Sequence, residues 1–328
     1  MTSRTTIPAR RLAGLCLVAA ALLATSARAE PWPERPITLV SQGAPGGSSD
    51  RIKTIVFDRV ATALGKPMVL DSRPGAAGTI AASYTARAAP DGYTLFLGTS
   101  GSLTAAPAVQ KNVPYDTLRD FTPITTLIEN SLALVVARSV PARDARELVE
   151  AMRREPGRYN YGSWGLGSAN FLAFEHFKIL TGTDAVHVPY KGAAPLLQGI
   201  LAGDVQVAFM DLPALRPHVE AGTLKMLGLA AQARDPTLPD LPTLTEQGLP
   251  IIAGGYFFLV GPAGIPDPIA NRLNAEVVRV LAEPDVRKQL LEIGNVPVGD
   301  TRRESAERIA SELAKWKRVV DAIGFQPQ

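Results

Sequence analysis

Residues 37–50 of this chain are Ile37-Thr38-Leu39-Val40-Ser41-Gln42-Gly43-Ala44-Pro45-Gly46-Gly47-Ser48-Ser49-Asp50. The first four are apolar or β-branched, which favours a strand, and the Gly/Pro run that follows favours a turn. Apolar residues then recur at helical spacing from Ile52 to Leu64. The pattern predicts a strand, a glycine loop and a helix, in that order.

A glycine loop at the start of a helix is a candidate anion site. The first four N–H groups of a helix lack intrahelical partners, and the helix dipole favours negative charge beside them. We therefore expect this loop to hold a carboxylate group of a ligand. The residues expected to contact that group are Ala44, Gly46, Gly47, Ser48 and Ser49.

Residues 1–29 have the features of a signal peptide. A basic start with Arg10 and Arg11 precedes an apolar run over 12–24, and Ala27-Arg28-Ala29 fits a cleavage signal. The apolar run is too short to span a bilayer. We expect export to the periplasm, with cleavage after Ala29.

Removal of this leader changes the charge balance. The 328-residue chain has 34 Lys and Arg against 31 Asp and Glu, and four of the Arg lie in the leader. The mature chain therefore has 30 bases and a formal charge of −1, which gives no case for nucleic-acid or membrane-surface binding. The single cysteine, Cys16, also leaves with the leader, so the mature chain must rely on its core rather than on disulfides.

Predicted strands and helices alternate downstream, which indicates parallel sheet covered by helices. Strands are expected at 67–70, 93–97, 121–128, 132–137, 159–161, 186–190, 205–210, 224–230 and 251–260. Helices are expected at 80–88, 144–154, 169–180 with Ser168 as N-cap, 191–201, near Pro213, and at 268–281, 284–291 and 304–323. The chain length favours two lobes. We place the first at 30–130 plus 251–328 and the second at 131–250.

The sequence contains no coherent catalytic set. Its histidines are His176, His187 and His218, and no H-E-x-x-H, cysteine cluster, G-x-S-x-G, P-loop or G-x-G-x-x-G pattern is present. We therefore predict no catalytic residue, no metal and no cofactor.

Four predicted strands end in glycine-bearing loops: 45–48, 98–101, 162–168 and 190–192. In open α/β sheets, ligands bind outside the carboxyl ends of the strands, so converging loops would form a site rich in N–H groups and hydroxyls, without a formal charge. The alternative is that these glycines only make turns. The further candidate residues are Thr99, Ser100, Ser163, Trp164, Gly167, Ser168, Ala169, Tyr190 and Lys191.

From about Trp32 to the C-terminus the sequence closely resembles the tripartite tricarboxylate transporter receptors, also called the TctC or Bug family. The matching motifs are Pro45-Gly46-Gly47-Ser48-Ser49-Asp50, Arg73-Pro74-Gly75-Ala76-Ala77-Gly78, Pro90-Asp91-Gly92-Tyr93-Thr94-Leu95, Gly165-Leu166-Gly167-Ser168, His187-Val188-Pro189-Tyr190-Lys191-Gly192, Leu241-Pro242-Thr243-Leu244-Thr245-Glu246-Gln247-Gly248-Leu249 and Gly261-Pro262-Ala263-Gly264-Ile265-Pro266. Their order and spacing together are highly specific.

The resemblance implies a two-lobed, type II periplasmic binding-protein fold with a hinge of two crossing strands. It implies that a small carboxylate is enclosed between the lobes, with the first glycine loop holding it and the other loops completing the cavity. Asp211 stands where the family commonly has a polar residue near the ligand. An N-cap for the helix near Pro213 is the alternative role for Asp211.

Three departures from the family pattern bear on the ligand. Ser41-Gln42-Gly43 replaces the usual apolar-Pro-aromatic approach, Phe171 stands where histidine is common, and Tyr256 stands where tryptophan is common. Together with Trp164, these aromatic residues would line a more apolar cavity and favour an aromatic or hydrophobic carboxylate. Packing of Phe171 beneath its own helix is the alternative.

The resemblance thus predicts a monomeric periplasmic solute-binding receptor. It would capture a small organic carboxylate and deliver it to the integral-membrane subunits of a tripartite tricarboxylate-type transporter. A ligand-dependent sensor that presents to a membrane kinase is the alternative within binding proteins. An enzyme on the same scaffold is disfavoured, because no acid–base or nucleophilic set is present.

Overall fold

A computed structural model describes residues 32–43, 47–165, 168–190, 192–322 and 324–325. The chain divides into two units, residues 1–34 and residues 35–328. In the first unit only residues 32–34 are described, and they form neither helix nor strand. The predicted leader and its cleavage site lie outside the described residues. All elements below belong to the second unit.

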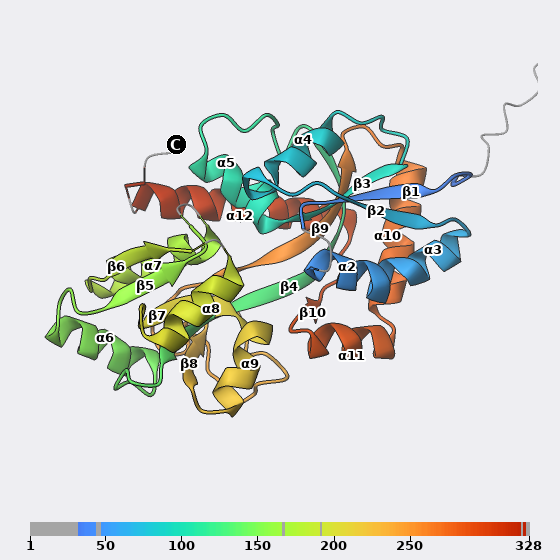
Figure 1. Cartoon of the computed structure of the whole chain (residues 1–328). Coiled ribbons are helices and arrows are strands. Elements are labelled where there is room, and N and C mark those ends of the chain that lie inside the picture. The colour runs from blue at the N-terminus through green and yellow to red at the C-terminus, as the bar shows by residue number, and fades with distance from the viewer. Residues whose placement is uncertain (1–31, 44–46, 166–167, 191, 323, 326–328) are drawn as a thin grey trace, which may run out of the picture. The chain divides into compact units, whose positions relative to one another are not determined.

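The second unit is built on a ten-stranded mixed sheet (Figure 1). Its strands are β1 (Ile37–Ser41), β2 (Met68–Ser72), β3 (Thr94–Thr99), β4 (Phe121–Ala137), β5 (Asn160–Ser163), β6 (Val186–Pro189), β7 (Val207–Asp211), β8 (Leu224–Leu229), β9 (Gly254–Pro262) and β10 (Val296–Pro297). The strand order is β2-β1-β3-β9-β4-β7-β5-β6, with β8 and β10 also paired to β4. The alternation of predicted strands and helices along the sequence included every one of these strands except the two-residue β10.

The direction of the strands separates the sheet into regions. Strands β1, β2 and β3 are parallel, and so are β5, β6 and β7. Around β4 and β9 the pairing is antiparallel, because β9 returns from one lobe to the other beside β4. The architecture is the two-lobed α/β fold that the resemblance predicts.

Strand β4 corrects one prediction, since the two strands expected at 121–128 and 132–137 are a single strand of 17 residues. Glu129, Asn130 and Ser131 are polar and suggest a break, but their backbone continues to pair with β9. The side chains at this point face a charged helix or a cavity rather than a core. An apolar pattern therefore underestimates the length of the strand.

The two lobes are joined at the middle of β4. Up to Ser131 this strand pairs with β9, and from Leu132 onward it pairs with β7 and β8. The segment before β9 lies alongside, because the N–H of Leu132 donates to the carbonyl of Ala253 at 3.2 Å. Two neighbouring strand crossings therefore connect the lobes. The exact lobe boundaries at 130 and 250 stay a prediction.

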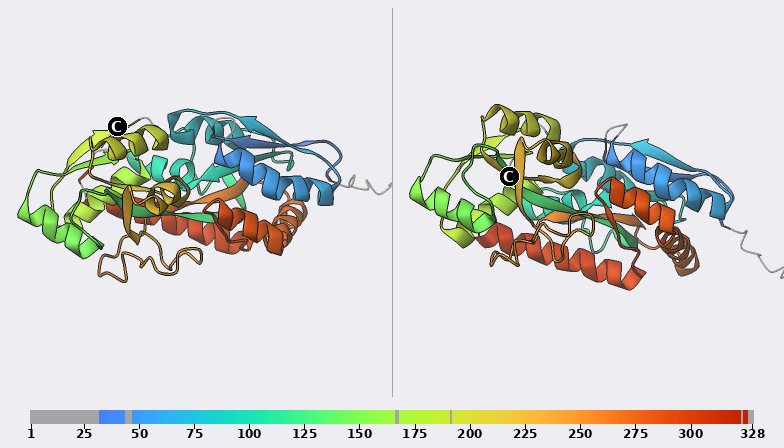
Figure 2. Two further views of the ribbon diagram at one scale, coloured as in Figure 1. Left: turned by 60° about the horizontal axis from the view of Figure 1, so that its bottom comes forward. Right: turned by 90° about the horizontal axis from the view of Figure 1, so that it is seen from below.

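Helices cover both parts of the sheet (Figures 1 and 2). They are α2 (Ser48–Ile52), continued by the π-helical turn η1 (Lys53–Phe57) and α3 (Asp58–Leu64), then α4 (Thr79–Ala86), α5 (Ala106–Val109), α6 (Ala145–Arg154), α7 (Ala169–Thr181), α8 (Ala193–Ala202), α9 (Leu212–Glu220), α10 (Asp267–Leu281), α11 (Pro284–Glu292) and α12 (Arg302–Ala322). A 3₁₀ turn (Ala76–Gly78) precedes α4, and a second π-helical turn (Gly101–Ala105) precedes α5. Among the described residues, no helix has both the length and the apolar character needed to cross a membrane.

The starts of α6 and α7 differ in how they are capped. The Asp144 carboxylate accepts a hydrogen bond from the N–H of Glu147 at 2.8 Å, so Asp144 is the N-cap of α6. Ser168 occupies the N-cap position of α7, but its side chain does not cap the helix. Its hydroxyl lies 2.7 Å from Oδ1 of Asn170 and 2.6 Å from the carbonyl oxygen of Gly165 instead. Ser168 is thus the N-cap residue of α7, as predicted, but without a capping hydrogen bond from its side chain.

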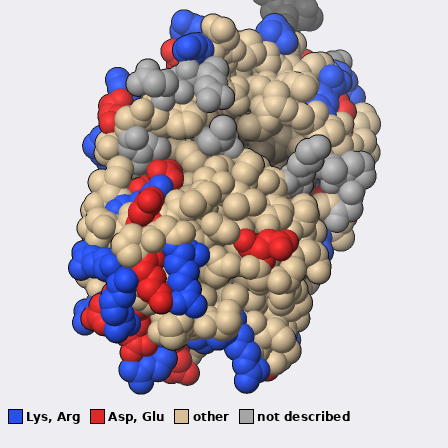
Figure 3. All heavy atoms as spheres, turned by 60° about the vertical axis from the view of Figure 1, so that its left-hand side comes forward, with Lys and Arg blue, Asp and Glu red and all other residues tan. Residues whose placement is uncertain are grey.

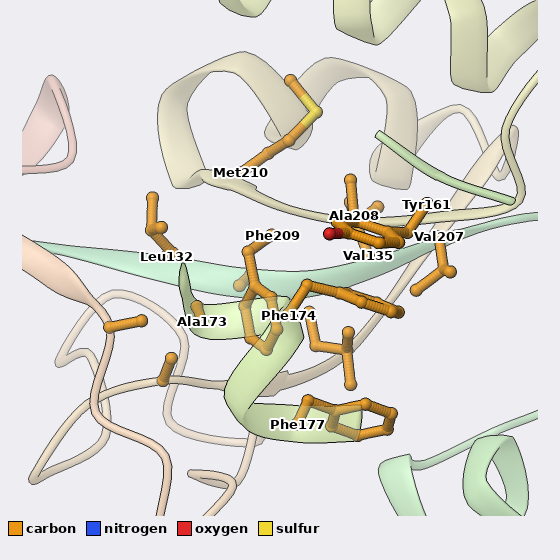
Figure 4. Close-up of a cluster of buried hydrophobic side chains, with 14 of the residues drawn as sticks. Leu132, Val135, Tyr161, Ala173, Phe174, Phe177, Val207, Ala208, Phe209 and Met210 are labelled. Carbon is orange, nitrogen blue, oxygen red and sulfur yellow. The ribbon is translucent and has the colours of Figure 1, made fainter. Parts of the chain in front are cut away.

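Two buried clusters stabilise the lobes. In the second lobe, Phe174 and Phe177 of α7 pack against the sheet beside Tyr161 and Phe209 (Figure 4). In the first lobe, strands β1, β3 and β9 supply the core. Helix α12 contributes to both clusters. Its Ile309 belongs to the cluster of the first lobe, and its Trp316 and Val320 belong to the cluster of the second lobe. It runs along both lobes in each view of Figure 2.

Candidate functional site

A cavity of about 890 Å³ opens where the two lobes meet. Its described lining comes from the ends of β1 and β3, the start of α2, the crossing strands β4 and β9, and the second-lobe elements around α7 and β7. Ligand sites in α/β proteins lie at such strand ends. The cavity is therefore the candidate site.

The cavity brings together nine of the predicted site residues: Gly47, Ser48, Thr99, Ser100, Trp164, Ser168, Ala169, Asp211 and Tyr256. Ala44, Gly46, Gly167 and Lys191 lie outside the described residues. Ser49, Ser163 and Tyr190 are not part of the described lining. That any of these residues contacts a ligand stays a prediction.

The three residues outside the lining have packing roles instead. Ser49 is 3% exposed and faces Gly43, where an added Cβ would lie 2.9 Å from the serine Oγ. The Ser163 hydroxyl is fully buried and lies 2.6 Å from Nε2 of His187. The Tyr190 ring lies against Gly199, where a Cβ would approach its hydroxyl oxygen to 2.3 Å. These three side chains point away from the cavity. The position of a residue in a loop does not determine the direction of its side chain.

The first-lobe wall contains a charge that we did not expect. Arg51 lies one turn after Ser48 on α2, and both line the cavity. Among the described lining residues, Arg51 is the only basic one. The sequence did hold a signal for this residue, because positions i and i+3 of a helix share a face.

Gln42 joins two strand ends at the same wall. Its Nε2 donates to Oγ1 of Thr99 at 3.1 Å, which links the end of β1 to the end of β3. Its Oε1 is buried and accepts no hydrogen bond from the described part of the chain. Gln42 was noted as atypical for the family but not as a site residue, and the structure places it in the lining.

Ser100 and Tyr256 connect β3 to β9 beneath the cavity. The backbone N–H of Tyr256 donates to the Ser100 hydroxyl at 2.9 Å, and Ser100 is only 2% exposed. The guanidinium carbon of Arg308 lies 4.9 Å from the Tyr256 ring centroid. Burial, followed by the nearby Glu129 charge, raises the pKa of Tyr256 to about 12. Tyr256 is thus a neutral wall of the site.

The aromatic residues divide between cavity and core. Trp164 and Tyr256 line the cavity, and so does Phe325. Phe171 is 6% exposed and packs against Tyr161 and His187, with centroid distances of 6.4 and 4.8 Å. Phe171 therefore takes its alternative role beneath its helix. The cavity thus keeps Trp164 and Tyr256 of the three expected aromatic residues and gains Phe325.

Asn130 and Asp211 form the polar floor where the lobes join. Nδ2 of Asn130 donates to Oδ1 of Asp211 at 3.2 Å. Asp211 precedes α9 at the N-cap position, yet its side chain makes no capping hydrogen bond. Asp211 therefore occupies the N-cap position that the alternative gave it, but its carboxylate does not cap the helix, and the residue also lines the cavity.

Burial raises the pKa of Asp211 to about 6, while the hydrogen bond from Asn130 acts in the opposite direction. Burial disfavours the charged form of a carboxyl group. Asp211 is the only acidic residue of the described lining. Asp211 was among the predicted site residues, whereas Arg51, just after the first glycine loop, adds a formal charge that the loops alone were not expected to supply.

Metal chemistry has no support in the described residues, which contain no group of three His, Cys, Asp or Glu side chains placed to hold an ion. On the face shown in Figure 3, acidic and basic side chains are interleaved along one side, and uncharged residues cover most of the remainder. This face carries no single-sign patch of the kind that attracts nucleic acid.

Comparison with known proteins identifies the family. The model of the tripartite tricarboxylate transporter family receptor matches residues 52–325. The chain belongs to this family. Family members are solute-binding receptors. The relatives described next align with this chain over nearly their whole length.

The protein BugT of Bordetella pertussis is 30% identical over 309 residues, which cover 94% of this chain and 95% of BugT. A Rhodopseudomonas palustris structure with adipate is 34% identical, with a TM-score of 0.81, and covers 90% of this chain and 100% of that one. The structure of MatC from the same organism with bound malate is 33% identical, with a TM-score of 0.75, and covers 88% and 100%. This receptor therefore shares both sequence and fold with proteins of known ligands.

Proposed function

We propose that this family member is an exported receptor that captures a small organic carboxylate between its lobes and delivers it to the integral-membrane subunits of a tripartite transporter. The observation that supports this proposal most directly is the cavity wall at the start of α2, which contains Gly47, Ser48 and Arg51. A guanidinium binds a carboxylate through parallel N–H donors. The first helical N–H groups add uncompensated donors at the same place.

The relatives support a carboxylate as the ligand class. Adipate and malate, which occupy two relatives, are both dicarboxylates. In this chain the first-lobe wall offers a cation and hydroxyls, while Trp164 and Tyr256 supply apolar surface. A carboxylate attached to a short carbon skeleton fits this combination.

Capture requires no bond to be made or broken. Ligand contacts to both lobes stabilise the closed arrangement, so the binding energy shifts a conformational equilibrium. The crossing at Ser131 and Leu132 is where the lobes would rotate. We further propose that the leader is cleaved after Ala29 and that the mature receptor is a monomer in the periplasm. A sensor that presents to a membrane kinase would use the same closure.

A thermal-shift screen tests the proposal. We expect at least one compound among dicarboxylates, tricarboxylates, amino acids and aromatic acids to raise the melting temperature, since a ligand that binds only the native state stabilises it by mass action. At a concentration 100 times the Kd, the stabilisation is about 2.7 kcal/mol. A screen in which only uncharged solutes shift the melt would contradict the carboxylate proposal.

Replacement of the cavity cation tests the first-lobe wall directly. We expect Arg51→Gln to weaken binding of the stabilising carboxylate by tenfold to hundredfold, because charge-assisted hydrogen bonds are worth about 1.5–3 kcal/mol. Isothermal titration calorimetry gives the affinity, and the melting temperature of the free protein should change little because Arg51 is exposed.

The matched control is Arg87→Gln. Arg87 is an exposed arginine at the end of α4 in the same lobe and lies outside the described cavity lining. It removes the same charge at a distance from the site. Equal losses of affinity in the two variants would mean that net charge, rather than the wall at Arg51, attracts the ligand.

A further inference from the structure

The two charged residues of the described cavity lining come from different lobes. Arg51 lies on α2 of the first lobe, and Asp211 ends β7 of the second. Within the described part of the chain, neither side chain forms an ion pair. The cavity therefore carries one positive and one negative group, each supplied by a different lobe.

Asp211 has fewer partners than a carboxylate requires. A carboxylate offers about four lone-pair sites, and the hydrogen bond from Nδ2 of Asn130 is the only side-chain bond that the described residues supply. The N–H groups at the start of α9 are not bound by its side chain. Burial of a charge without such partners is unfavourable. A donor from outside the chain would relieve it.

Asn130 supplies a second acceptor at the same place. The amide oxygen and nitrogen share one carbon, so Oδ1 of Asn130 lies beside the Nδ2 that donates to Asp211, and it also lies near Gly255. The described residues supply no hydrogen bond to this oxygen. Both residues line the cavity. Two acceptor groups, one of them anionic, match the several N–H donors and the charge of an ammonium group.

We infer that Asp211 and Asn130 form a subsite for a protonated amine, so that the ligand is an amino carboxylate whose carboxylate faces Arg51. This inference rests on the proposed function, because it assumes that a carboxylate occupies the first-lobe wall. It adds the chemistry of the opposite end of the ligand.

The same floor discriminates against the dicarboxylates that occupy the two relatives. A second carboxylate beside Asp211 would bring two negative charges together, and they repel each other unless one holds a proton. A protonated amine instead replaces repulsion by attraction. Rejection of unpaired or like charges is a common source of ligand specificity.

The test uses two compound series and one isosteric variant. Mature protein is titrated calorimetrically at pH 8 with aspartate, glutamate and 4-aminobutyrate, and in parallel with succinate, glutarate and adipate. We expect at least one of the three amines to bind the native protein at least tenfold more tightly than any of the three amine-free dicarboxylates. In Asp211→Asn we expect the order to reverse, with at least a tenfold loss for the amino carboxylate and a gain for a dicarboxylate.

The control is Asp240→Asn, which removes the same charge at an exposed position outside the described lining. It should leave the order of the two series unchanged. A native protein that binds dicarboxylates as tightly as amino carboxylates, or an Asp211→Asn variant with unchanged preference, would overturn the amine subsite and leave the carboxylate receptor intact. Absence of binding by both series and by all other carboxylates would overturn the proposed function, and the subsite with it.

Discussion

Gly254→Ala is expected to lower the free energy of unfolding by about 3 kcal/mol or more, which is the scale of strongly strained backbone positions. Gly254 has φ of +142°, which side chains rarely adopt, and it begins β9 at the crossing between the lobes. An added Cβ would lie 2.3 Å from the carbonyl oxygen of Asn130 and 3.0 Å from Cα of Ser131. Both are backbone atoms, so no side-chain rotation can relieve the clash.

Urea unfolding of the variant and the native protein measures this effect. The matched control is Gly157→Ala, because Gly157 also has a positive φ, of +77°, but an added Cβ there would meet no atom within 4 Å. We expect the control to lose about 1 kcal/mol, as for alanine in an unfavourable backbone region. Similar losses in both variants would show that the close approach of β9 to β4 does not constrain the crossing.

Asp211→Asn is expected to raise the stability of the ligand-free protein by up to about 3 kcal/mol at pH 8. Burial raises the pKa of this carboxyl from 3.8 to about 6, and each pKa unit corresponds to about 1.36 kcal/mol. Between these two values the folded protein retains a proton that the unfolded chain has lost, so stability falls as the pH rises. Asparagine lacks this titration and keeps an oxygen for the hydrogen bond from Asn130.

The gain should therefore depend on pH in a defined way. It should be absent below about pH 4, roughly half developed near pH 5 and complete above pH 6 to 7. Denaturant unfolding at pH 5 and pH 8 measures the difference, with Asp240→Asn as a variant of equal charge change. A gain of the same size at both pH values would indicate that titration of Asp211 is not its source.

The two effects at Asp211 have opposite signs. A carboxylate that destabilises the free protein yet remains in the cavity is what a binding role would produce, because functional groups are commonly kept at some expense of stability. The amine subsite gives this group its partner only when the ligand is bound. Stability and selectivity measured on the same Asp211→Asn protein therefore test one physical account.

The local sequence pattern was sufficient for most of the fold. The strand and helix around the first glycine loop follow from the apolar periodicity between Ile37 and Leu64, and they form β1, α2 and α3. The helix at 144–154 was predicted for the same reason, and the structure adds an N-cap at Asp144, a hydrogen bond between close neighbours in the chain. The glycine motifs also predicted the family, because their order and spacing are properties of the sequence itself.

The tertiary structure alone decided which groups face the cavity. Ser163 ends β5 and Tyr190 follows β6, but the Ser163 hydroxyl lies beside His187 and the Tyr190 ring lies against Gly199. Asp211 is at the N-cap position of α9, but its carboxylate accepts a hydrogen bond from Asn130, 81 positions earlier, across the crossing strands instead of capping the helix. Periodicity encodes the conformation of neighbouring residues, whereas the direction and charge state of a site residue depend on partners that only folding brings within a few ångströms.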